Sequence, residues 1–325
     1  MTSSTESRLR DALAHPLAGT SFELGEKYEG KVRDNYVRQS LRFLVTSDRV
    51  SAFDRVLGTL PLKGQVLQWV SSFWFRHTER LVPHHLVEVV DPNVIVAHNC
   101  EPLPVEMVVR GYITGVTSTS MWTHYEAGSR NFCGHALPDG LQKHQSLDRP
   151  LLTPSSKAAK GDHDRSLSRE EILAQGRISA DDFDRAAELA LILYQRGVEH
   201  CRARGLILVD SKYEFGRAPS GEIVVIDEVH TPDSSRFWKA DTYAKRFAAG
   251  NDPESFDKEY LRRWLADQGF RGDGPVPPIP DEIKVEAMRR YVEACETIVG
   301  ESFTPDLQPP TSRIEANLRR AGYLA

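Results

Sequence analysis

The sequence contains no long hydrophobic segment. Nowhere do 18 or more apolar residues follow one another, and the first residues, MTSSTESRLRDALAH, lack the apolar stretch of a secretion signal. The four cysteines, Cys100, Cys133, Cys201 and Cys295, are scattered and form no C-x-x-C pair. We therefore expect neither membrane anchoring nor export, and a cytoplasmic protein with reduced thiols.

The sequence also lacks a strong charge of one sign. It has 41 Lys and Arg against 46 Asp and Glu, a formal net charge of −5 at pH 7. Nucleic-acid binding is not expected, because contacts to a phosphate backbone require a basic patch. With 325 residues, 40% of them hydrophobic and 27% charged, the chain has the composition of a globular protein. This length predicts about two domains.

Three common catalytic motifs are missing or incomplete. Neither the H-E-x-x-H pair of zinc enzymes nor the G-x-S-x-G elbow of serine hydrolases occurs. Residues 25–32, GEKYEGKV, come close to a P-loop, but Val32 stands where the magnesium-binding Ser or Thr is needed. The flanking residues predict strands, so a P-loop fold is not expected. A hairpin that places Gly30 and Lys31 over nucleotide phosphates, as in the glycine-rich loops of kinases, is the alternative.

The sequence patterns predict an α+β protein. Helical spacing of apolar residues predicts helices at residues 64–79, 180–204, 257–268 and from 281 into the 290s. Short apolar or alternating runs predict strands at residues 23–36, 41–46, 86–90, 94–97, 206–215 and 223–227. Residues 133–161 lack periodicity, which is typical of a functional or disordered loop. We place a sheet-rich, nucleotide-phosphate-binding domain in residues 1–105 and a larger catalytic domain with a C-terminal helical segment in residues 106–325.

A row of charged residues ends the run at 206–215. Side chains alternate along a strand, so Asp210, Lys212 and Glu214 share one face. Buried charges must pair or bind a ligand, and carboxylates together with phosphate are usual ligands of Mg²⁺. A charged row on the solvent-exposed face of an edge strand is the alternative. The following strand ends in Asp227 and would return this acid beside the first strand, which favours a metal–nucleotide site, although the register stays open.

Two arginines are candidates for binding phosphate. Arg236 follows a Pro-containing turn and Ser235, while Arg110 ends an apolar run and precedes glycines and hydroxyl residues. A guanidinium can hold phosphate through two parallel hydrogen bonds, and backbone amides near glycine add donors. The alternatives are an ordinary turn for Arg236 and a solvent-exposed strand end for Arg110.

Several separated segments together resemble the phosphoribosylaminoimidazole-succinocarboxamide synthases, or SAICAR synthetases, of de novo purine synthesis. In the family's order, they are GKVRD (30–34), TSDRVSAFD (46–54), LPVEMVVRGYITG (103–115), TPSSKAAKGDHD (153–164), LVDSKYEFG (208–216) and the stretch 227–238. Their joint occurrence is far more specific than any single motif. The resemblance implies an α+β, two-domain nucleotide-binding fold similar to ATP-grasp enzymes and kinases, with antiparallel sheets flanked by helices.

The resemblance also implies the ligands, which are ATP, Mg²⁺, L-aspartate and carboxyaminoimidazole ribotide. Gly30 and Lys31 would contact the ATP phosphates, and Glu214 and Asp227 would bind ATP through Mg²⁺ at the phosphate tail. The products would be SAICAR, ADP and phosphate.

The ribotide site follows from the same resemblance. Arg110 and Arg236 would hold the ribotide phosphate, with Ser235 beside them. Asp164 and Lys157, from the 153–164 segment, would contact the rest of the ribotide. A hydrophilic surface loop without a ligand is the alternative for this segment.

The resemblance places Asp210 and Lys212 near the reacting carboxylate. We hypothesise that ATP phosphorylates this carboxylate to an acyl phosphate, which the aspartate amine then attacks. Lys31 and Mg²⁺ would offset charge on the transferring phosphoryl group, and Asp210 would accept the amine proton.

One position departs from the family. Members commonly have Ser after the glycine that is Gly115 here, whereas this chain has Val116, and Thr117 or Ser118 is the alternative source of a hydroxyl. Further candidates for the substrate pocket are Asp48, Ser51, Asp54 and Lys63.

Two other functions stay open at this point. A kinase-like phosphotransferase could use the same charged cluster on a hydroxyl substrate, and a nucleotide sensor would bind ATP without turnover. We expect small-molecule partners only, no nucleic acid, no membrane, and a monomer or small homo-oligomer.

Overall fold

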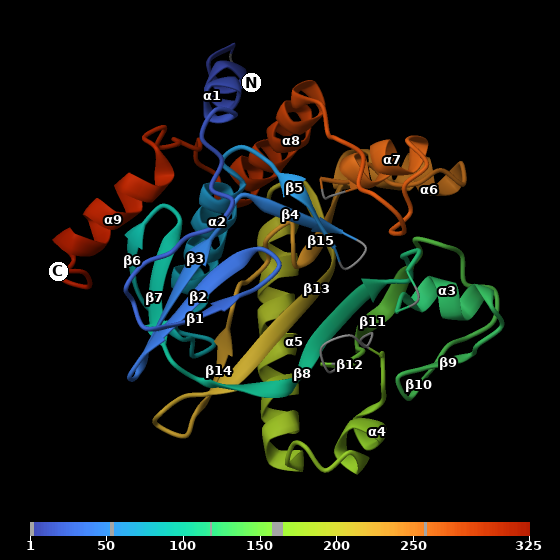
Figure 1. Cartoon of the computed structure of the whole chain (residues 1–325). Helices are drawn as coiled ribbons and strands as arrows, with labels where there is room; N and C mark the ends of the chain where they lie inside the picture. Colours follow the sequence, from blue (N-terminus) through green and yellow to red (C-terminus); the bar gives the residue numbers. More distant parts are fainter. Residues whose placement is uncertain (1–2, 53–54, 118, 158–164, 257–258) are drawn as a thin grey trace.

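The described residues form two large antiparallel sheets and two small two-stranded ones, β4–β5 and β9–β10. The computed structural model describes residues 3–52, 55–117, 119–157, 165–256 and 259–325. One large sheet has the strand order β1-β2-β3-β7-β6. The other large sheet has the order β11-β8-β13-β14, with β12 beside β8 and β15 beside β13. Figure 1 shows the long helix α5 running behind β13 and β8 near the centre of the molecule, and α9 beside β6 at the left edge.

The strands are β1 Glu26–Glu29, β2 Arg33–Arg38, β3 Leu41–Thr46, β4 Arg49–Ala52, β5 Arg55–Thr59, β6 Leu86–Asp91, β7 Val94–His98, β8 Glu101–Tyr112, β9 Asn131–Phe132, β10 His135–Ala136, β11 Ser146–Leu152, β12 Ser155–Ser156, β13 Leu206–Arg217, β14 Ile223–Ile226 and β15 Ser235–Lys239. The helices are α1 Ser3–Ala12, α2 Lys63–Thr78, α3 Met121–Glu126, α4 Arg169–Ala174, α5 Ala180–Arg202, α6 Ala240–Ala248, α7 Glu259–Asp267, α8 Asp281–Val299 and α9 Pro310–Arg320.

The four predicted helices are confirmed as α2, α5, α7 and α8. The boundaries of α5 have a local cause. The Ser179 hydroxyl accepts a hydrogen bond from the backbone N of Asp182 (3.1 Å), which satisfies one amide of the first turn. Gly205, two residues beyond the C-cap, adopts φ +71°, a conformation that glycine enters without strain.

Two predicted segments differ from the structure. Residues 23–36 form β1 and part of β2 with a turn between them, rather than one continuous strand. Residues 133–161, predicted to lack secondary structure, contain β10, β11 and β12 in their described part. β11 and β12 pair with β8, so their strand structure depends on a partner distant in sequence, which local periodicity does not reveal.

The β8–β13–β15 ladder positions the polar residues. β13 is antiparallel to β8, β14 and β15. One face of β8 and β13 packs into the hydrophobic core that α5 also enters, through Val105, Met107, Val109, Tyr213 and Phe215. Alternation along the strands therefore turns Glu106, Arg110, Asp210, Lys212 and Glu214 to the opposite face.

β8 also bears on the predicted domain organisation. Residues 105 and 106, between which we place a domain boundary, both lie within this strand. The division into domains 1–105 and 106–325 stays a prediction.

None of the helices within the described ranges has the length and apolar character needed to cross a membrane.

Candidate active site

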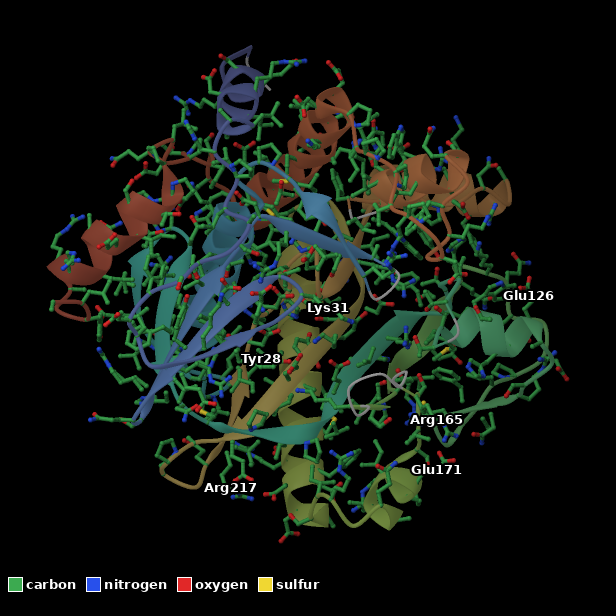
Figure 2. All side chains as sticks on the ribbon, viewed as in Figure 1. Tyr28, Lys31, Glu126, Arg165, Glu171 and Arg217 are labelled. Carbon is green, nitrogen blue, oxygen red and sulfur yellow. The ribbon has the colours of Figure 1, made fainter. Side chains whose placement is uncertain are left out.

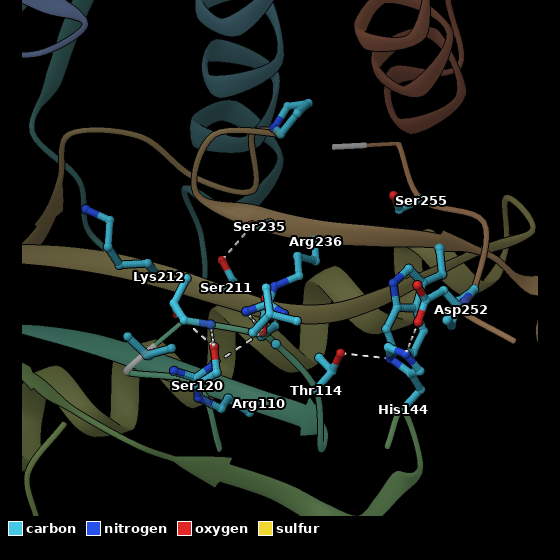
Figure 3. A pocket seen from close by; sticks show the side chains of 18 of the residues that line it. Arg110, Thr114, Ser120, His144, Ser211, Lys212, Ser235, Arg236, Asp252 and Ser255 are labelled. Atoms are coloured by element: carbon cyan, nitrogen blue, oxygen red, sulfur yellow. Dashed lines mark hydrogen bonds and ion pairs between the residues drawn. The ribbon is translucent and has the colours of Figure 1, made fainter. Parts of the chain in front are cut away.

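Two of the pockets in the described residues contain the candidate side chains. The first lies over the C-terminal part of β8, the middle of β13 and the start of β15, and encloses about 280 Å³. Figure 3 shows Arg110 entering it from β8 and Arg236 from β15, with Lys212 and Ser211 on β13 between them. The strand register explains this convergence, because Asp210 is the cross-strand partner of both arginines. Arg110 and Arg236, which are more than a hundred residues apart in the sequence, therefore line the same pocket.

Both arginines form ion pairs with the same carboxylate. Asp210 Oδ2 lies 3.4 Å from Arg110 Nη1 and 3.2 Å from Arg236 Nη2. Arg110 is almost completely buried, and its Nε donates to the Thr153 hydroxyl at 2.9 Å. Burial lowers the pKa of Arg110, and Asp210 opposes that shift. The arginine pair is therefore fixed in place around one internal anion.

Hydroxyl groups complete the wall of this first pocket. Ser235 Oγ donates to Ser211 Oγ at 2.8 Å, and Thr117 Oγ1 lies 2.8 Å from Ser120 Oγ. Val116 also lines the pocket and is 71% exposed. Gly115 has φ +102°, and a Cβ there would lie 2.3 Å from Ser120 Oγ. The chain therefore offers the hydroxyls of Thr117 and Ser120 beside the apolar Val116; Ser118 lies outside the described residues.

The second pocket lies between the β1–β2 turn and the paired ends of β13 and β14, and encloses about 550 Å³. Gly30 and Lys31 line it from the turn, which confirms their predicted hairpin position; Lys31 is labelled in Figure 2. Glu214 and Asp227 line it from the other side. The predicted approach of Asp227 to the first strand is explained by the register, in which Glu214 pairs with Ile226.

A four-residue charge network lies at this second pocket. Lys212 Nζ is 3.1 Å from Glu106 Oε1 and 2.5 Å from Glu214 Oε1, and Lys157 pairs with the other oxygen of Glu214. Burial disfavours charge on Lys212, but Glu214 and Glu106 outweigh it and raise the lysine pKa well above its ordinary value. Burial likewise opposes charge on Glu214, yet Lys212 and Lys157 hold its pKa well below the usual range. Burial raises the pKa of Glu106, against the effect of Lys212.

Arg33 forms a second buried ion-pair group in the same pocket. Its two terminal nitrogens contact Asp227 and Glu228. Burial opposes its charge, but both carboxylates raise the pKa of Arg33 above its ordinary value. Asp227 has φ +69°, a left-handed conformation that few residue types adopt readily. Arg33 thus holds the acidic end of β14 in position.

The remaining candidates from the sequence have different locations. Ser51 lines the second pocket, and Lys63 pairs with Asp233, which borders both pockets. Asp48 instead accepts backbone hydrogen bonds from Gly64 and Leu17, at 2.9 and 2.8 Å, and so caps α2. Asp54 and Asp164 lie outside the described residues.

The cap residue Asp48 gives a prediction for pH-dependent stability. Burial raises its pKa to about 6, against the backbone hydrogen bonds from Gly64 and Leu17. A carboxyl whose pKa is higher in the folded than in the unfolded state stabilises the fold while it is protonated. This stabilisation is fully present below about pH 4 and is lost as the pH rises through 6, which lowers the free energy of unfolding by about 3 kcal/mol. Asp48→Asn lacks this titration. Urea denaturation at a series of pH values should show the variant gaining stability relative to the parent between pH 4 and 7; parallel profiles would contradict this.

Sequence reasoning did not single out several residues of the site. Glu106 and Arg33 fall inside the matching segments, but only the strand register shows that they face Glu214 and Asp227. On the outer wall of the first pocket, His144 Nε2 lies 2.9 Å from Asp252 Oδ1. The alternation of β8 was a signal that could have identified Glu106, which shares a face with Arg110.

Comparison with known proteins decides the family. A family model described as SAICAR synthetase matches residues 26–276. The chain belongs to the SAICAR synthetase family. A phosphoribosylaminoimidazole-succinocarboxamide synthase of Legionella pneumophila (strain Paris) is 48% identical over 307 residues, 94% of this chain and 98% of the relative. A chloroplastic enzyme of that name from Arabidopsis thaliana is 44% identical over 321 residues, 96% of this chain and 78% of the relative.

The fold is that of solved SAICAR synthetases. The SAICAR synthase of Saccharomyces cerevisiae, solved in complex with SAICAR, superimposes with a TM-score of 0.75 at 31% identity, covering 89% of this chain and 100% of that one. A type-2 SAICAR synthetase in complex with ADP superimposes with a TM-score of 0.65 at 24% identity, covering 86% and 100%, and supports the fold alone. The family and the α+β fold predicted from the sequence are confirmed.

Proposed function

We propose that the two pockets are the ATP and ribotide sites of the SAICAR synthetase reaction. As a member of this family, the chain is an ATP-dependent carbon–nitrogen ligase of purine biosynthesis, as predicted. It forms SAICAR from carboxyaminoimidazole ribotide and L-aspartate, with release of ADP and phosphate. The residues that perform each part are our proposal.

One observation carries this assignment. Lys212 and Asp233 line both pockets, so the pockets meet at these two side chains. A phosphoryl group must pass from ATP in one pocket to a carboxylate in the other, and catalysis of such transfers depends mainly on positioning and charge neutralisation. Lys212, held charged by Glu214 and Glu106, lies where that charge develops.

The second pocket suits ATP. Gly30 and Lys31 at the β1–β2 turn would contact its phosphates, and Glu214 and Asp227 would face the end of the phosphate chain. The turn leaves the backbone close to the pocket, and Lys31 brings a positive charge. Support for a nucleotide here comes from the ligase function itself, which consumes ATP.

Magnesium fits this site only together with the nucleotide. Within the described ranges, no group of three or more Asp, Glu, His or Cys side chains is arranged to hold a metal ion. Glu214 and Asp227 supply two carboxylates, and Mg²⁺ usually takes one or two carboxylates plus phosphate oxygens and water. Bound there, the ion would neutralise charge on the transferring phosphoryl group. Lys157, Lys212 and Arg33 balance the same carboxylates in the structure.

The first pocket suits the ribotide. Arg110 and Arg236 would hold its phosphate, with the Ser235 hydroxyl beside them. Ser120 and Thr117 offer further hydroxyls where Val116 replaces the serine expected for the family. Lys157 borders the second pocket and would reach the ribotide carboxylate from that side. The contact between Asp164 and the ribotide stays a prediction, because Asp164 lies outside the described residues.

The proposed chemistry has two steps. A carboxylate oxygen of the ribotide attacks the γ-phosphorus of ATP, giving an acyl phosphate and ADP. The amine of L-aspartate then attacks the acyl carbon, the C–O bond to phosphate breaks, and the amine proton passes to a base. We propose Asp210 as this base, since its carboxylate lines the ribotide pocket beside Lys212.

Replacing Asp210 tests that role. Asp210→Asn should lower kcat by about 10²-fold, the usual contribution of general base catalysis, and should change the pH dependence of kcat. The ribotide KM should fall, because the two arginines lose the carboxylate that competes with the substrate phosphate. Steady-state kinetics over a pH series measure all three. Full turnover with an unchanged pH profile would assign the proton to another group.

The overall function is tested by ADP release from purified protein with ATP, Mg²⁺, L-aspartate and carboxyaminoimidazole ribotide, omitting one component at a time. Turnover that requires all four establishes the ligase. ADP release without aspartate would indicate a phosphotransferase, and ATP binding without turnover would indicate a sensor.

We further propose that the enzyme acts in the cytoplasm as a monomer or small homo-oligomer.

A further inference from the structure

Asp233 occupies an unusual place between the two pockets. It follows Pro232 in the turn before β15, its carboxylate is 5% exposed, and it borders both the ATP pocket and the ribotide pocket. Its backbone N donates to the Thr231 hydroxyl at 3.2 Å, which fixes the main chain of the turn. A buried carboxylate in such a place needs donors to hold it.

Two helices supply these donors from behind the site. Lys63 Nζ, at the first residue of α2, donates to Asp233 Oδ2 at 2.7 Å. Tyr291 OH, from α8, donates to Oδ1 at 3.1 Å. Both donors are buried, Lys63 completely and Tyr291 to 2% exposure. Each carboxylate oxygen therefore has one donor on the helix side.

The two contacts fix the Asp233 carboxylate from both oxygens. An ionised carboxylate has about four lone-pair sites, so it can accept hydrogen bonds from several groups at once. Donors on both oxygens also restrict rotation of the carboxylate plane. The side chain borders the ribotide pocket, where a bound ribotide would present N–H and O–H groups.

We propose that Tyr291 is a positioning residue for the ligase reaction. With Lys63, it orients Asp233 so that the carboxylate accepts a hydrogen bond from the ribotide. This inference rests on the proposed function of the first pocket. Tyr291 lies beyond residues 26–276, which match the family model, so α8 adds a contribution from the C-terminal segment to the site.

Ribotide binding, measured by isothermal titration calorimetry without ATP, tests the proposal even for variants without turnover. Tyr291→Phe removes one hydroxyl and keeps the buried ring. It should weaken binding about tenfold, as expected for a hydrogen bond to a charged group. In an Asp233→Asn background the same change should have no further effect, because Tyr291 acts through that carboxylate.

The matched control is Tyr125→Phe. Tyr125 is also buried, and its hydroxyl donates to the Pro138 carbonyl at 2.9 Å, outside both pockets. This variant should bind the ribotide as the parent does. Equal binding by the parent and Tyr291→Phe, or equal weakening in both backgrounds, would overturn the positioning role while leaving the proposed function intact. A parent protein that binds no ribotide would instead refute the proposed function, and the inference with it.

Discussion

Lys212→Met should lower kcat for SAICAR formation by about 10³-fold, the upper range for loss of one preorganised charge-stabilising group. Lys212 borders both pockets and is held charged between Glu106 and Glu214. Without it, these cross-strand partners repel each other, and the positive charge shared by the two pockets, across which we propose the phosphoryl group passes, is lost. Steady-state kinetics with all substrates saturating measure the effect, and circular dichroism verifies the fold.

Lys239→Met is the control for this experiment. Lys239 also forms ion pairs with two glutamates, Glu254 at 4.0 Å and Glu293 at 3.7 Å, but its side chain is 37% exposed. Its replacement should leave kcat unchanged, because solvent screens such pairs. A Lys212→Met enzyme that folds and keeps kcat within tenfold of the parent would show that Lys212 does not stabilise the transferring group.

Arg33→Met should reduce the free energy of unfolding by about 3–5 kcal/mol, the usual effect of removing one partner from a buried ion pair. The variant leaves Asp227 and Glu228 without the guanidinium that contacts both. Glu228 is itself almost completely buried, so its desolvation is no longer compensated. Urea denaturation at pH 7 measures the change.

A surface arginine provides the comparison. Arg169 forms two hydrogen bonds of 2.7 Å with Asp184, yet both side chains are about half exposed. Arg169→Met should leave the denaturation midpoint almost unchanged. If Arg33→Met unfolded at the same urea concentration as Arg169→Met, the buried group around Arg33 would contribute nothing to stability.

The sequence predicted those parts of the site that depend on local patterns. Alternation along a strand placed Asp210, Lys212 and Glu214 on one face, and the return strand placed Asp227 beside them. The helical spacing of apolar residues predicted α5 almost completely. These features are set by residues close in sequence, so a single chain is enough to recognise them.

The rest depends on contacts between distant residues. The pairing of Glu106 with Glu214 requires the register of β8 against β13, which one sequence cannot fix. Tyr291 reaches Asp233 only because α8 packs behind the site, 58 positions further along the chain. The strand structure of β11 likewise requires its partner β8. The hydrophobic pattern of a sequence identifies the buried face of each helix or strand, but not which elements pack against each other.

The shared anion between Arg110 and Arg236 has a consequence for ligand exchange. Asp210 pairs with both guanidinium groups in the structure, so the arginines are already ordered before a substrate binds. If the ribotide phosphate binds as we propose, it would compete with this resident carboxylate for the same donors. On product release, Asp210 would pair again with both arginines, so two adjacent positive charges would not be left without an anion. The site would thus exchange one negative partner for another, which would favour rapid release of the dianionic phosphate group of the product.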